Sequence, residues 1–554
     1  MSVMTYVPYG AGGVIIRVEA DIRRGIPGID ITGLAEGAVR EARERVRAAF
    51  RNSGFSFPLD RILINLAPAG LRKDGAALDL PIALSVMAAA GIAPVPQSIL
   101  MMGELELSGR IRPVRGVLAA IAAGLEEGIA EFIVPAENGE EAAILSGEGF
   151  GKNPGMRFAA VSNLKEAVHA LFVRSEKGSL PQGEWGKNNI SRPPLPAPHS
   201  PDFADVRGQA VYKRALEIAA AGGHNLLVFG PPGAGKTMLA RRLPLIMAPL
   251  SPDEAVEVTR LYSLAGPLKA GAGPANGFID RLITEPPFRS PHHSASAEGI
   301  LGGGRPPRPG EISLAHFGVL FLDEAPEFRA NVLQALREPL EDRVISISRA
   351  EGPLRLPAEF QLLLAANACP CGRLGFNRSR MRNGETDNDA TLGETQDCLC
   401  SSDEIYRYWR KFGGALLDRI DLRVPVVPPG ISEIGKPREN SSGGEESSTG
   451  IARRVVKAVD VQRQRGGGIK VRRNASIPVG KIEEFCPMSD QAQSAFHKAL
   501  ARLGLSGRAY HGILRVARTI ADLEGSEVIG TAHVLEAVQH RRYGEDPYEI
   551  LSMG

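Results

Sequence analysis

The segment that most restricts the fold of this chain is the glycine-rich run GPPGAGKT at Gly230–Thr237. It follows an apolar run, Asn225–Phe229, and precedes a helix-like run, Met238–Leu243. A glycine-rich turn between a strand and a helix binds phosphate, because its backbone N–H groups and the helix N-terminus both point toward the anion. The pattern therefore predicts an α/β protein with a parallel-sheet core that binds ATP.

Each residue type in this loop has a use in binding a nucleoside triphosphate. Its glycines let the backbone turn N–H groups inward onto the phosphates. Lys236 is expected to reach the β- and γ-phosphates, and Thr237 to hold Mg²⁺. The residues expected at the phosphates are Gly230, Pro231, Pro232, Gly233, Ala234, Gly235, Lys236 and Thr237.

A second apolar run, Gly318–Leu322, ends in two carboxylates. Asp323 can coordinate Mg²⁺ through water, and Glu324 is placed to polarise the attacking water as a general base. Two carboxylates could instead cap a helix that starts near Phe328. Their occurrence beside a phosphate-binding loop favours the catalytic interpretation.

A third apolar run, Phe360–Ala366, ends in Asn367. A polar side chain at this point can position the water near the γ-phosphate. An asparagine that ends a strand is often only a turn residue. Because this run follows the other two in order, we predict the water-positioning role.

The chain of 554 residues is too long for one core of ordinary size. We expect folded parts at 1–172, 202–429 and 453–554. The middle part alternates helix and strand, as a parallel sheet requires, and the last part is helical in pattern. The linkers expected between them are 173–201, rich in Gly, Pro, Ser and Asn, and 430–452, which contains SSGGEESSTG.

Composition restricts where such a protein works. The first ten residues have no signal-peptide pattern, and the longest apolar stretch, Leu80–Ala93, is too short to span a bilayer. Five cysteines in a chain of this length are no disulfide framework. We therefore expect a cytoplasmic protein with no membrane partner. The formal net charge is only +2, so a nucleic-acid site would have to be local.

Several long motifs, in the same order as in a known family, carry a resemblance. In the middle of the chain they are GPPGAGKTMLARRL, FRSPHHSAS, RPGEISLAHFGVLFLDE, FQLLLAANACPCG and LLDRIDL. Before them stand GIPGIDITGL, RERVRAAFRNSG and INLAPAGLRKDGAALDLPIAL, and after them SGRAYHGILRVARTIADLEG. The chain resembles the magnesium-chelatase-like AAA+ proteins, in particular their ComM (YifB) branch.

This resemblance implies an α/β P-loop AAA+ core, preceded by an α+β Lon-protease-like domain and followed by a helical lid. It also implies a hexameric ring of identical subunits. For the ComM branch it implies a DNA-remodelling helicase that acts in homologous recombination during natural transformation.

Further site residues follow from the resemblance alone. Arg419 in LLDRID matches the arginine finger that reaches the γ-phosphate bound by a neighbouring subunit, although it could instead be a surface arginine paired with Asp418 or Asp421. Arg508 matches the sensor arginine of the lid, with Arg515 as the alternative.

The segment against adenine is matched by Val206, Gly208 and Gln209. The sequence also departs from the family pattern at two positions. Ala368 stands where the first proline of Asn-Pro-Cys-Pro-Cys-Gly is usual, and Gly512 where an arginine is common.

The first domain is not expected to be a protease. Lon-type proteolysis uses a serine nucleophile and a lysine base. The segment Lys73–Ala77 resembles the loop that carries the serine, and the aligned residue is Ala77. We place the lysine position at Leu118. Neither side chain can do the chemistry, so a scaffold or interaction role is expected.

Four of the five cysteines form a CxC…CxC set, which comprises Cys369, Cys371, Cys398 and Cys400. Four thiolates could bind Zn²⁺ tetrahedrally, or all four could remain reduced thiols. The pair His292 and His293 lacks other ligand-like spacing, so we expect it to contact DNA or a subunit interface rather than a metal.

A DNA grip is expected in Val344–Pro357, where two alternating runs surround a glycine-containing turn. The resemblance implies a pre-sensor hairpin here that points into the pore. Arg349 and Arg355 flank its tip and could meet phosphates, with Arg289 as a second candidate; each could instead pair with Glu351 or face solvent.

Three functions remain open from the sequence. The first is an ATP-driven DNA translocase or branch-migration helicase. The second is a chelatase motor subunit that drives metal insertion into a tetrapyrrole, and the third is a remodeller of proteins. The fused N-terminal domain and the CPCG loop favour the first, because chelatase motor subunits do not usually carry that domain.

Overall fold

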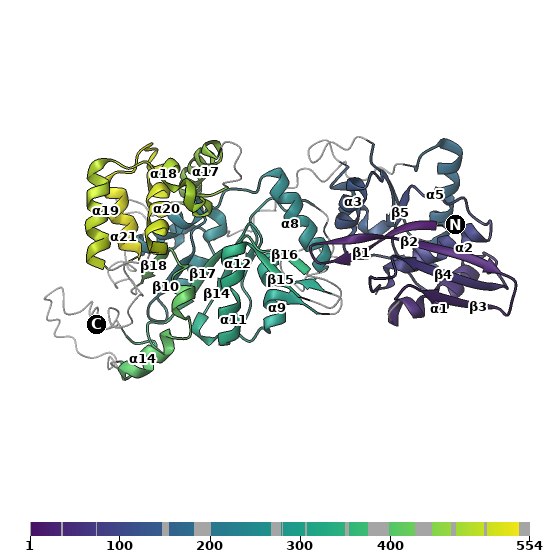
Figure 1. Cartoon of the computed structure of the whole chain (residues 1–554), viewed down its shortest axis with the longest axis horizontal. Coiled ribbons are helices and arrows are strands. Elements are labelled where there is room, and N and C mark those ends of the chain that lie inside the picture. The colour runs from purple at the N-terminus through teal and green to yellow at the C-terminus, as the bar shows by residue number, and fades with distance from the viewer. Residues whose placement is uncertain are drawn as a thin grey trace.

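The computed structural model describes residues 2–34, 37–73, 75–146, 155–181, 201–266, 279, 281–304, 307–348, 354–374, 398–426, 446–466, 472–503 and 507–541. An N-terminal α/β part, a central α/β part and a C-terminal helical part follow one another along the long axis of the molecule (Figure 1). None of the described helices is long and apolar enough to cross a membrane.

The N-terminal part is built on a seven-stranded mixed sheet of order β3-β4-β2-β1-β5-β8-β9. Its strands are β1 (Ser2–Tyr9), β2 (Gly12–Arg23), β3 (Gly28–Thr32), β4 (Arg61–Ala67), β5 (Ile99–Met101), β8 (Glu131–Pro135) and β9 (Arg157–Val161). β2 runs antiparallel to both β1 and β4, and the other pairs are parallel. A short antiparallel pair, β6 (Glu104–Leu105) and β7 (Ile111–Arg112), lies outside the sheet.

Helices complete this part of the chain: α1 (Gly37–Asn52), η1 (Ala76–Leu78), α2 (Asp79–Ala89), α3 (Val117–Glu126), η2 (Ala136–Asn138), α4 (Gly139–Ala143) and α5 (Leu164–Lys177). α2 is buried along nearly its whole length, which explains its apolar sequence. α5 ends at Lys177, beyond the expected boundary at 172. Its first turn is capped by Asn163, and Gly178 ends it in the left-handed conformation.

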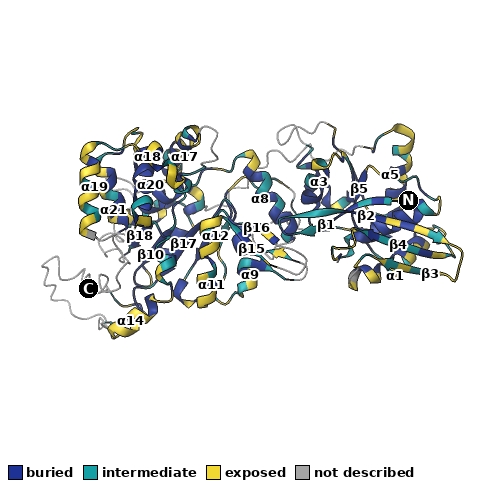
Figure 2. Cartoon of the chain, viewed as in Figure 1, coloured by how far each residue is buried: buried dark blue, intermediate teal, exposed yellow. Residues whose placement is uncertain are grey.

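The central part contains a five-stranded sheet of order β11-β14-β17-β10-β18, parallel throughout. Its strands are β10 (Leu226–Phe229), β11 (Phe288–Arg289), β14 (Val319–Leu322), β17 (Gln361–Ala366) and β18 (Leu422–Pro425). Every residue of β10, β14 and β17 is buried, because helices cover both faces of the sheet (Figure 2). The parallel-sheet core predicted from the sequence is confirmed.

The central helices are η3 (Phe203–Asp205), α6 (Ala210–Gly222), α7 (Lys236–Ala240), η4 (Leu243–Ile246), α8 (Pro252–Ala265), α9 (Ala297–Leu301), α10 (Glu311–Leu314), η5 (Ala325–Glu327), α11 (Ala330–Ala335), α12 (Arg337–Asp342), α14 (Ser402–Trp409) and α15 (Gly414–Leu417). Two antiparallel pairs lie outside the sheet: β12 (Gly302–Gly303) with β13 (Arg308–Pro309), and β15 (Val344–Ile347) with β16 (Leu354–Pro357). The second pair is the hairpin predicted at Val344–Pro357.

The C-terminal part is helical, as expected: α17 (Ser448–Arg465), η6 (Asn474–Ser476), η7 (Val479–Lys481), α18 (Ile482–Phe485), α19 (Asp490–Leu503), α20 (Gly507–Glu524) and α21 (Thr531–Arg541). The segment Ile482–Leu503 is divided into α18 and α19. Pro487 lies in the break, where it has no N–H to donate to a helix. α17 begins inside the expected linker 430–452, with Ser447 as its N-cap.

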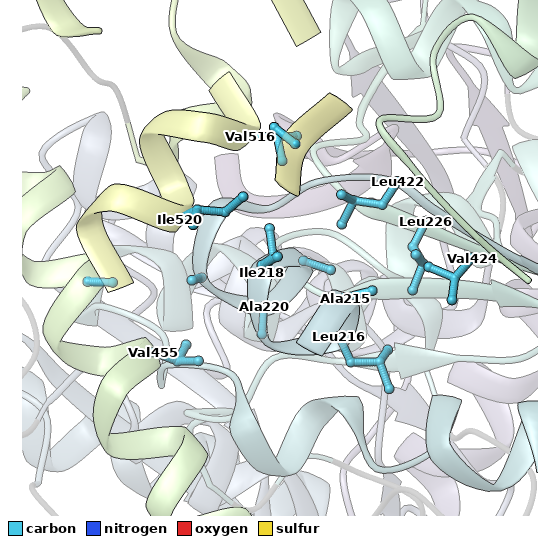
Figure 3. Packing of buried hydrophobic residues seen from close by; sticks show 14 of the residues in the cluster. Ala215, Leu216, Ile218, Ala220, Leu226, Leu422, Val424, Val455, Val516 and Ile520 are labelled. Carbon is cyan, nitrogen blue, oxygen red and sulfur yellow. The ribbon is translucent and has the colours of Figure 1, made fainter. Parts of the chain in front are cut away.

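The helical part and the central sheet share one hydrophobic core. Val455 of α17 and Ile520 of α20 lie with Ile218 of α6 in this cluster, as Figure 3 shows. Leu226 and Leu422 of the sheet belong to it as well. The C-terminal helices are therefore packed against the core on the α6 side of the sheet.

The N-terminal and central parts meet through α3 and α8. Leu264 of α8 is buried within a cluster otherwise made by the N-terminal part. Nearby, the fully buried Glu141 accepts hydrogen bonds from Ser263 Oγ and from the backbone N–H of Leu118. Burial raises the pKa of Glu141, while these donors oppose that rise.

Candidate functional site

Three neighbouring strands end at one edge of the central sheet. β10 is aligned with β17 so that Phe229 lies opposite Ala366, and β14 is aligned so that Leu322 lies opposite Leu364. The residues that follow each strand therefore come together at the carboxyl edge. They are Gly230 after β10, Asp323 after β14 and Asn367 after β17.

The loop from Gly230 to Lys236 has the backbone of a phosphate cradle. Gly233 and Gly235 have φ values of +78° and +85°, which favour glycine. Gly230 has a further reason, because a Cβ there would lie 2.1 Å from the carbonyl oxygen of Val426. Helix α7 begins directly after Gly235, so its N-terminus faces the loop.

Lys236 links the loop to the end of β17. Its Nζ donates hydrogen bonds to the carbonyl oxygens of Gly230 (2.7 Å) and Pro231 (2.8 Å), and to Asn367 Oδ1 (3.2 Å). Burial lowers the pKa of Lys236 to about 8, opposed by the charges of Asp323 and Glu324. Phosphate oxygens would favour the charged form of this ammonium, which is what a triphosphate site requires.

Thr237 and Asp323 form the part of the site that suits a magnesium ion. Thr237 Oγ1 donates to Asp323 Oδ2 at 2.9 Å, so a hydroxyl and a carboxylate lie together beside the loop. Mg²⁺ prefers oxygen ligands and usually binds through one or two carboxylates plus substrate phosphates. The donor set and the glycine cradle therefore fit ATP with Mg²⁺.

Glu324 follows Asp323 and has an unusual backbone. Its φ is +49°, in the left-handed region that a non-glycine residue seldom adopts. Its side chain is 62% exposed, and Oε2 lies 3.9 Å from His293 Nδ1. The carboxylate is thus open to water, as a general base must be. The sequence analysis predicts that His293 contacts DNA or a subunit interface. It gives no indication that His293 lies near Glu324.

The segment expected against adenine lies beside the same loop. Gln209 Nε2 donates to the carbonyl oxygen of Ala234 at 3.1 Å, and Val206 and Ala234 belong to one buried cluster. Gly208 and Gln209 both have positive φ values, +66° and +56°. All three expected residues are therefore on the chain that immediately precedes α6, next to the loop.

Arg419 and Arg508 share one carboxylate. Arg419 Nη2 lies 2.5 Å from Glu341 Oε2, and Arg508 is hydrogen-bonded to Glu341 Oε1. Arg508 also approaches Asp418 at 3.5 Å. The hydrogen bond from Arg419, together with Arg508, holds the pKa of Glu341 below its ordinary value. The two arginines thus form one basic cluster, to which α12 contributes the counterion.

The alternative sensor, Arg515, has a different setting. It donates from Nε and Nη2 to the carbonyl oxygen of Ile477, at 3.0 Å and 2.6 Å. Burial lowers its pKa. These contacts are typical of an arginine that fixes one helix to the segment beside it.

The three arginines expected to contact DNA have unequal surroundings. Arg289 is 17% exposed and makes two hydrogen bonds to Glu311, at 2.7 Å and 2.9 Å. This bidentate ion pair indicates a structural role rather than a phosphate contact. Arg355 is exposed on β16, opposite Ser346. Arg349 lies outside the described residues.

The four cysteines come together although two come from each side of a long insertion. One ligand atom from each of Cys369, Cys371, Cys398 and Cys400 lies within 4.8 Å of every other. This group could hold a metal ion. Cys486 is buried elsewhere, in the core shared with the helical part.

The residues aligned with a protease dyad are apolar and lie in one cluster. Leu118 is fully buried in α3, and Ala77 packs against the same cluster from η1. Lys73, in the segment before Ala77, is buried and donates to the carbonyl oxygens of Gly33 and Pro68. Both of these hydrogen bonds join the Lys73 ammonium group to the backbone.

Comparison with known proteins agrees with this geometry. Residues 202–433 match the family model described as magnesium chelatase, subunit ChlI, residues 18–138 match subunit ChlI of Mg-chelatase, and residues 445–541 match the C-terminal model of that subunit. The N-terminal region is 29% identical over 136 residues to the Lon protease of Salinispora arenicola, covering 23% of this chain and 18% of that protein.

Two relatives match over almost their whole length. The protein YifB of Salmonella typhimurium is 38% identical over 547 residues, which cover 97% of this chain and 96% of the relative. The competence protein ComM of Haemophilus influenzae is 38% identical over 537 residues, which cover 96% of this chain and 95% of the relative. The chain therefore belongs to the YifB/ComM family of magnesium-chelatase-like AAA+ proteins.

Proposed function

We propose that this protein hydrolyses ATP and uses the energy to move along or remodel DNA as a ring of identical subunits. The observation that carries the proposal is the meeting of Lys236, Thr237, Asp323 and Asn367 at one edge of the sheet, through contacts of 2.9 Å and 3.2 Å. ATP is the substrate and Mg²⁺ the cofactor.

Each residue at this edge has a task in hydrolysis. Lys236 exchanges its backbone partners for phosphate oxygens, and Thr237 and Asp323 hold the magnesium ion, which neutralises charge on the phosphates. Glu324 takes a proton from the attacking water. Asn367, already hydrogen-bonded to Lys236, orients that water relative to the γ-phosphate.

Hydrolysis is proposed to need two subunits. Arg419 and Arg508 share Glu341 and belong to one basic cluster, so they can act together on an anion. We propose that this cluster faces the ATP of a neighbouring subunit, where Arg419 is the arginine finger and Arg508 the sensor. Exchange of the Glu341 carboxylate for phosphate oxygens would then couple subunit contact to catalysis.

DNA is the molecule that we propose the ring moves along or remodels. The relative named competence protein ComM supports this, because competence concerns uptake and use of DNA. Arg355 supports it structurally, because its side chain is exposed on a hairpin whose other face is buried. The match to chelatase subunits keeps tetrapyrrole metallation as the rival function. Stimulation of the ATPase by DNA, and not by a porphyrin, separates the two.

The first prediction concerns the division of work at the nucleotide. Lys236→Ala should lose ATP binding. Glu324→Gln should bind ATP normally and hydrolyse it about 100-fold or more slowly, because a general base contributes about that much. Binding is measured with a fluorescent ATP analogue and turnover by phosphate release. Glu327→Gln, the same exchange at an exposed position nearby, should behave as wild type. Equal turnover in Glu324→Gln and wild type would contradict the assignment.

The second prediction concerns action between subunits. Arg419→Ala should assemble and bind ATP but hydrolyse it on the order of 1,000-fold more slowly, because an arginine finger has about that effect. Mixing it with the Lys236→Ala protein should restore part of the activity, since some interfaces then pair an intact Arg419 with an intact Lys236. If subunits are shown to exchange and no activity returns, Arg419 does not act in trans.

The third prediction tests the DNA grip. Arg349→Ala with Arg355→Ala should leave assembly and basal ATPase unchanged. DNA affinity should fall similarly on unrelated sequences, and the slope of log K against log salt should become shallower by about 2, as loss of two phosphate contacts implies. Arg407→Ala with Lys457→Ala removes the same charge from exposed helix positions and should have little effect. Unchanged unwinding of branched DNA by the first variant would exclude the hairpin as the grip.

The fourth prediction concerns the Lon-like part. The purified protein should not degrade unfolded proteins such as casein, with or without ATP, because Ala77 and Leu118 supply neither nucleophile nor base. Release of acid-soluble peptide is the measurement. ATP-dependent proteolysis that is abolished by a substitution within residues 1–172 would overturn this expectation.

A further inference from the structure

The four cysteines stand on the two segments that flank the carboxyl edge of β17. Cys369 and Cys371 follow Asn367, and Cys398 and Cys400 directly precede helix α14. Three sulfur–sulfur distances are 3.3 Å, 3.6 Å and 3.6 Å. A disulfide requires about 2.05 Å, whereas thiolates about 2.3 Å from a tetrahedral Zn²⁺ lie roughly 3.8 Å apart. The spacing is that of ligands around one ion.

A backbone donor also faces one of the four sulfurs. The N–H of Leu374 donates to Cys369 Sγ at 3.4 Å. Such bonds stabilise metal-bound thiolates and fix their direction. Four sulfur ligands in this geometry favour Zn²⁺ over the hard cations.

The same two segments hold the site of ATP hydrolysis. Trp409, at the end of α14, donates from Nε1 to the carbonyl oxygen of Ala368 at 3.1 Å. Its ring packs edge-on against Phe229, the last residue of β10, with centroids 5.4 Å apart. Tyr408 accepts a hydrogen bond from the backbone of Asn367. The start and end of the cysteine-bearing insertion are thus both in contact with the edge of the sheet.

The cysteine segment also contacts the phosphate loop directly. Gly372 has a φ of +76°, and a Cβ there would lie 3.0 Å from Cδ of Pro232 and 3.9 Å from Cγ of Asn367. The position of this turn therefore limits where Pro232 and Asn367 can lie. A displacement of this turn would therefore move Asn367 and alter the Lys236–Asn367 hydrogen bond.

We propose that Cys369, Cys371, Cys398 and Cys400 bind one Zn²⁺, and that this ion holds Asn367 and the phosphate loop in the arrangement needed for hydrolysis. The ion joins the segment after β17 to the start of α14, whose last residues hold Asn367 and Ala368. Loss of the metal would therefore slow hydrolysis from outside the nucleotide pocket. The second half of this proposal rests on the proposed ATPase function, and the first half does not.

The metal itself is tested by elemental analysis of the purified full-length chain. About one zinc per chain is expected, since a four-cysteine site binds one ion. Cys398→Ser with Cys400→Ser should contain none. Cys486→Ala, which removes the one cysteine outside the cluster, should keep the full content. Absence of zinc from the wild type, with no uptake of added Zn²⁺, overturns the proposal, as does a full zinc content in the double variant.

The link to the edge of the sheet has a readout that needs no activity. The chain contains two tryptophans, so Trp185→Phe leaves Trp409 as the only indole that reports. Zinc is removed with a chelator, the protein is desalted, and the metal is added back. Emission of Trp409 should change on removal and return with Zn²⁺. An unchanged emission would contradict a role for the ion in holding Ala368 and Trp409 together.

The effect on hydrolysis is tested in the same samples, assayed with Mg²⁺ present. Turnover should fall on the order of 100-fold without zinc, comparable to loss of a well-placed reacting group. In an Asn367→Ala background, zinc removal should slow turnover less than it does in the wild type, because part of its effect acts through Asn367. Additive losses would mean that zinc acts elsewhere. Zinc binding with a normal fluorescence response but no ATPase in any sample would refute the ATPase function and leave the metal site standing.

Discussion

The chemistry of this protein depends on the pairing register of three parallel strands. Phe229 is paired with Ala366, and Leu322 with Leu364, so the residues after each strand are placed within reach of one another by backbone hydrogen bonds alone. Lys236 then connects two of these ends, because it donates both to the loop after β10 and to Asn367 after β17. A shift of one residue in any pair would turn side chains to the opposite face of the sheet. The buried strands make such a shift costly.

A second group of charges, outside this edge, includes Glu341 of α12. Glu341 accepts hydrogen bonds from Arg419 and Arg508, which come from the turn before β18 and from α20. Asp418 also belongs to this cluster, because it lies 3.5 Å from Arg508 and 3.2 Å from Arg541. Three guanidinium groups therefore face two carboxylates, which leaves a net positive charge, and Arg419 is only 10% exposed. A positive cluster held in this way is suited to receive a second anion without rearranging its backbone. This is the physical reason for assigning the two arginines to one shared task.

The sequence predicts the elements whose signals are local and fails where the signal is distributed. The strands before Gly230, Asp323 and Asn367 could be located because each is an apolar run that is followed either by the glycine-rich loop or by a polar residue. Only the first turn of α17 falls inside the expected linker 430–452, because serines and glycines at the start of a helix have the same composition as a linker. The short strand β5 carries no alternation that could identify it.

Contacts between residues that are far apart in the chain could not be predicted from the sequence either. His293 lies near Glu324 because β11 is parallel to β14, so the two strands end at the same edge. A two-residue strand gives no periodicity from which this could be inferred. The Arg419–Glu341–Arg508 cluster likewise joins three elements far apart in the chain, and only the packed structure brings them together.

The N-terminal part is in contact with the hairpin that carries Arg355. The turn between β1 and β2 packs on the hairpin: a Cβ on Gly10 would lie 2.6 Å from Cδ1 of Leu354, and Tyr9 and Ala11 pack against the cluster that contains Leu354 and Leu356. Side chains alternate along β16, so the contact covers its apolar face and leaves Arg355 on the exposed one. This contact agrees with the scaffold role expected for a domain that carries Ala77 and Leu118 at the aligned dyad positions. Its docking on Ser263 and Leu264 then fixes the hairpin relative to the body that binds the nucleotide.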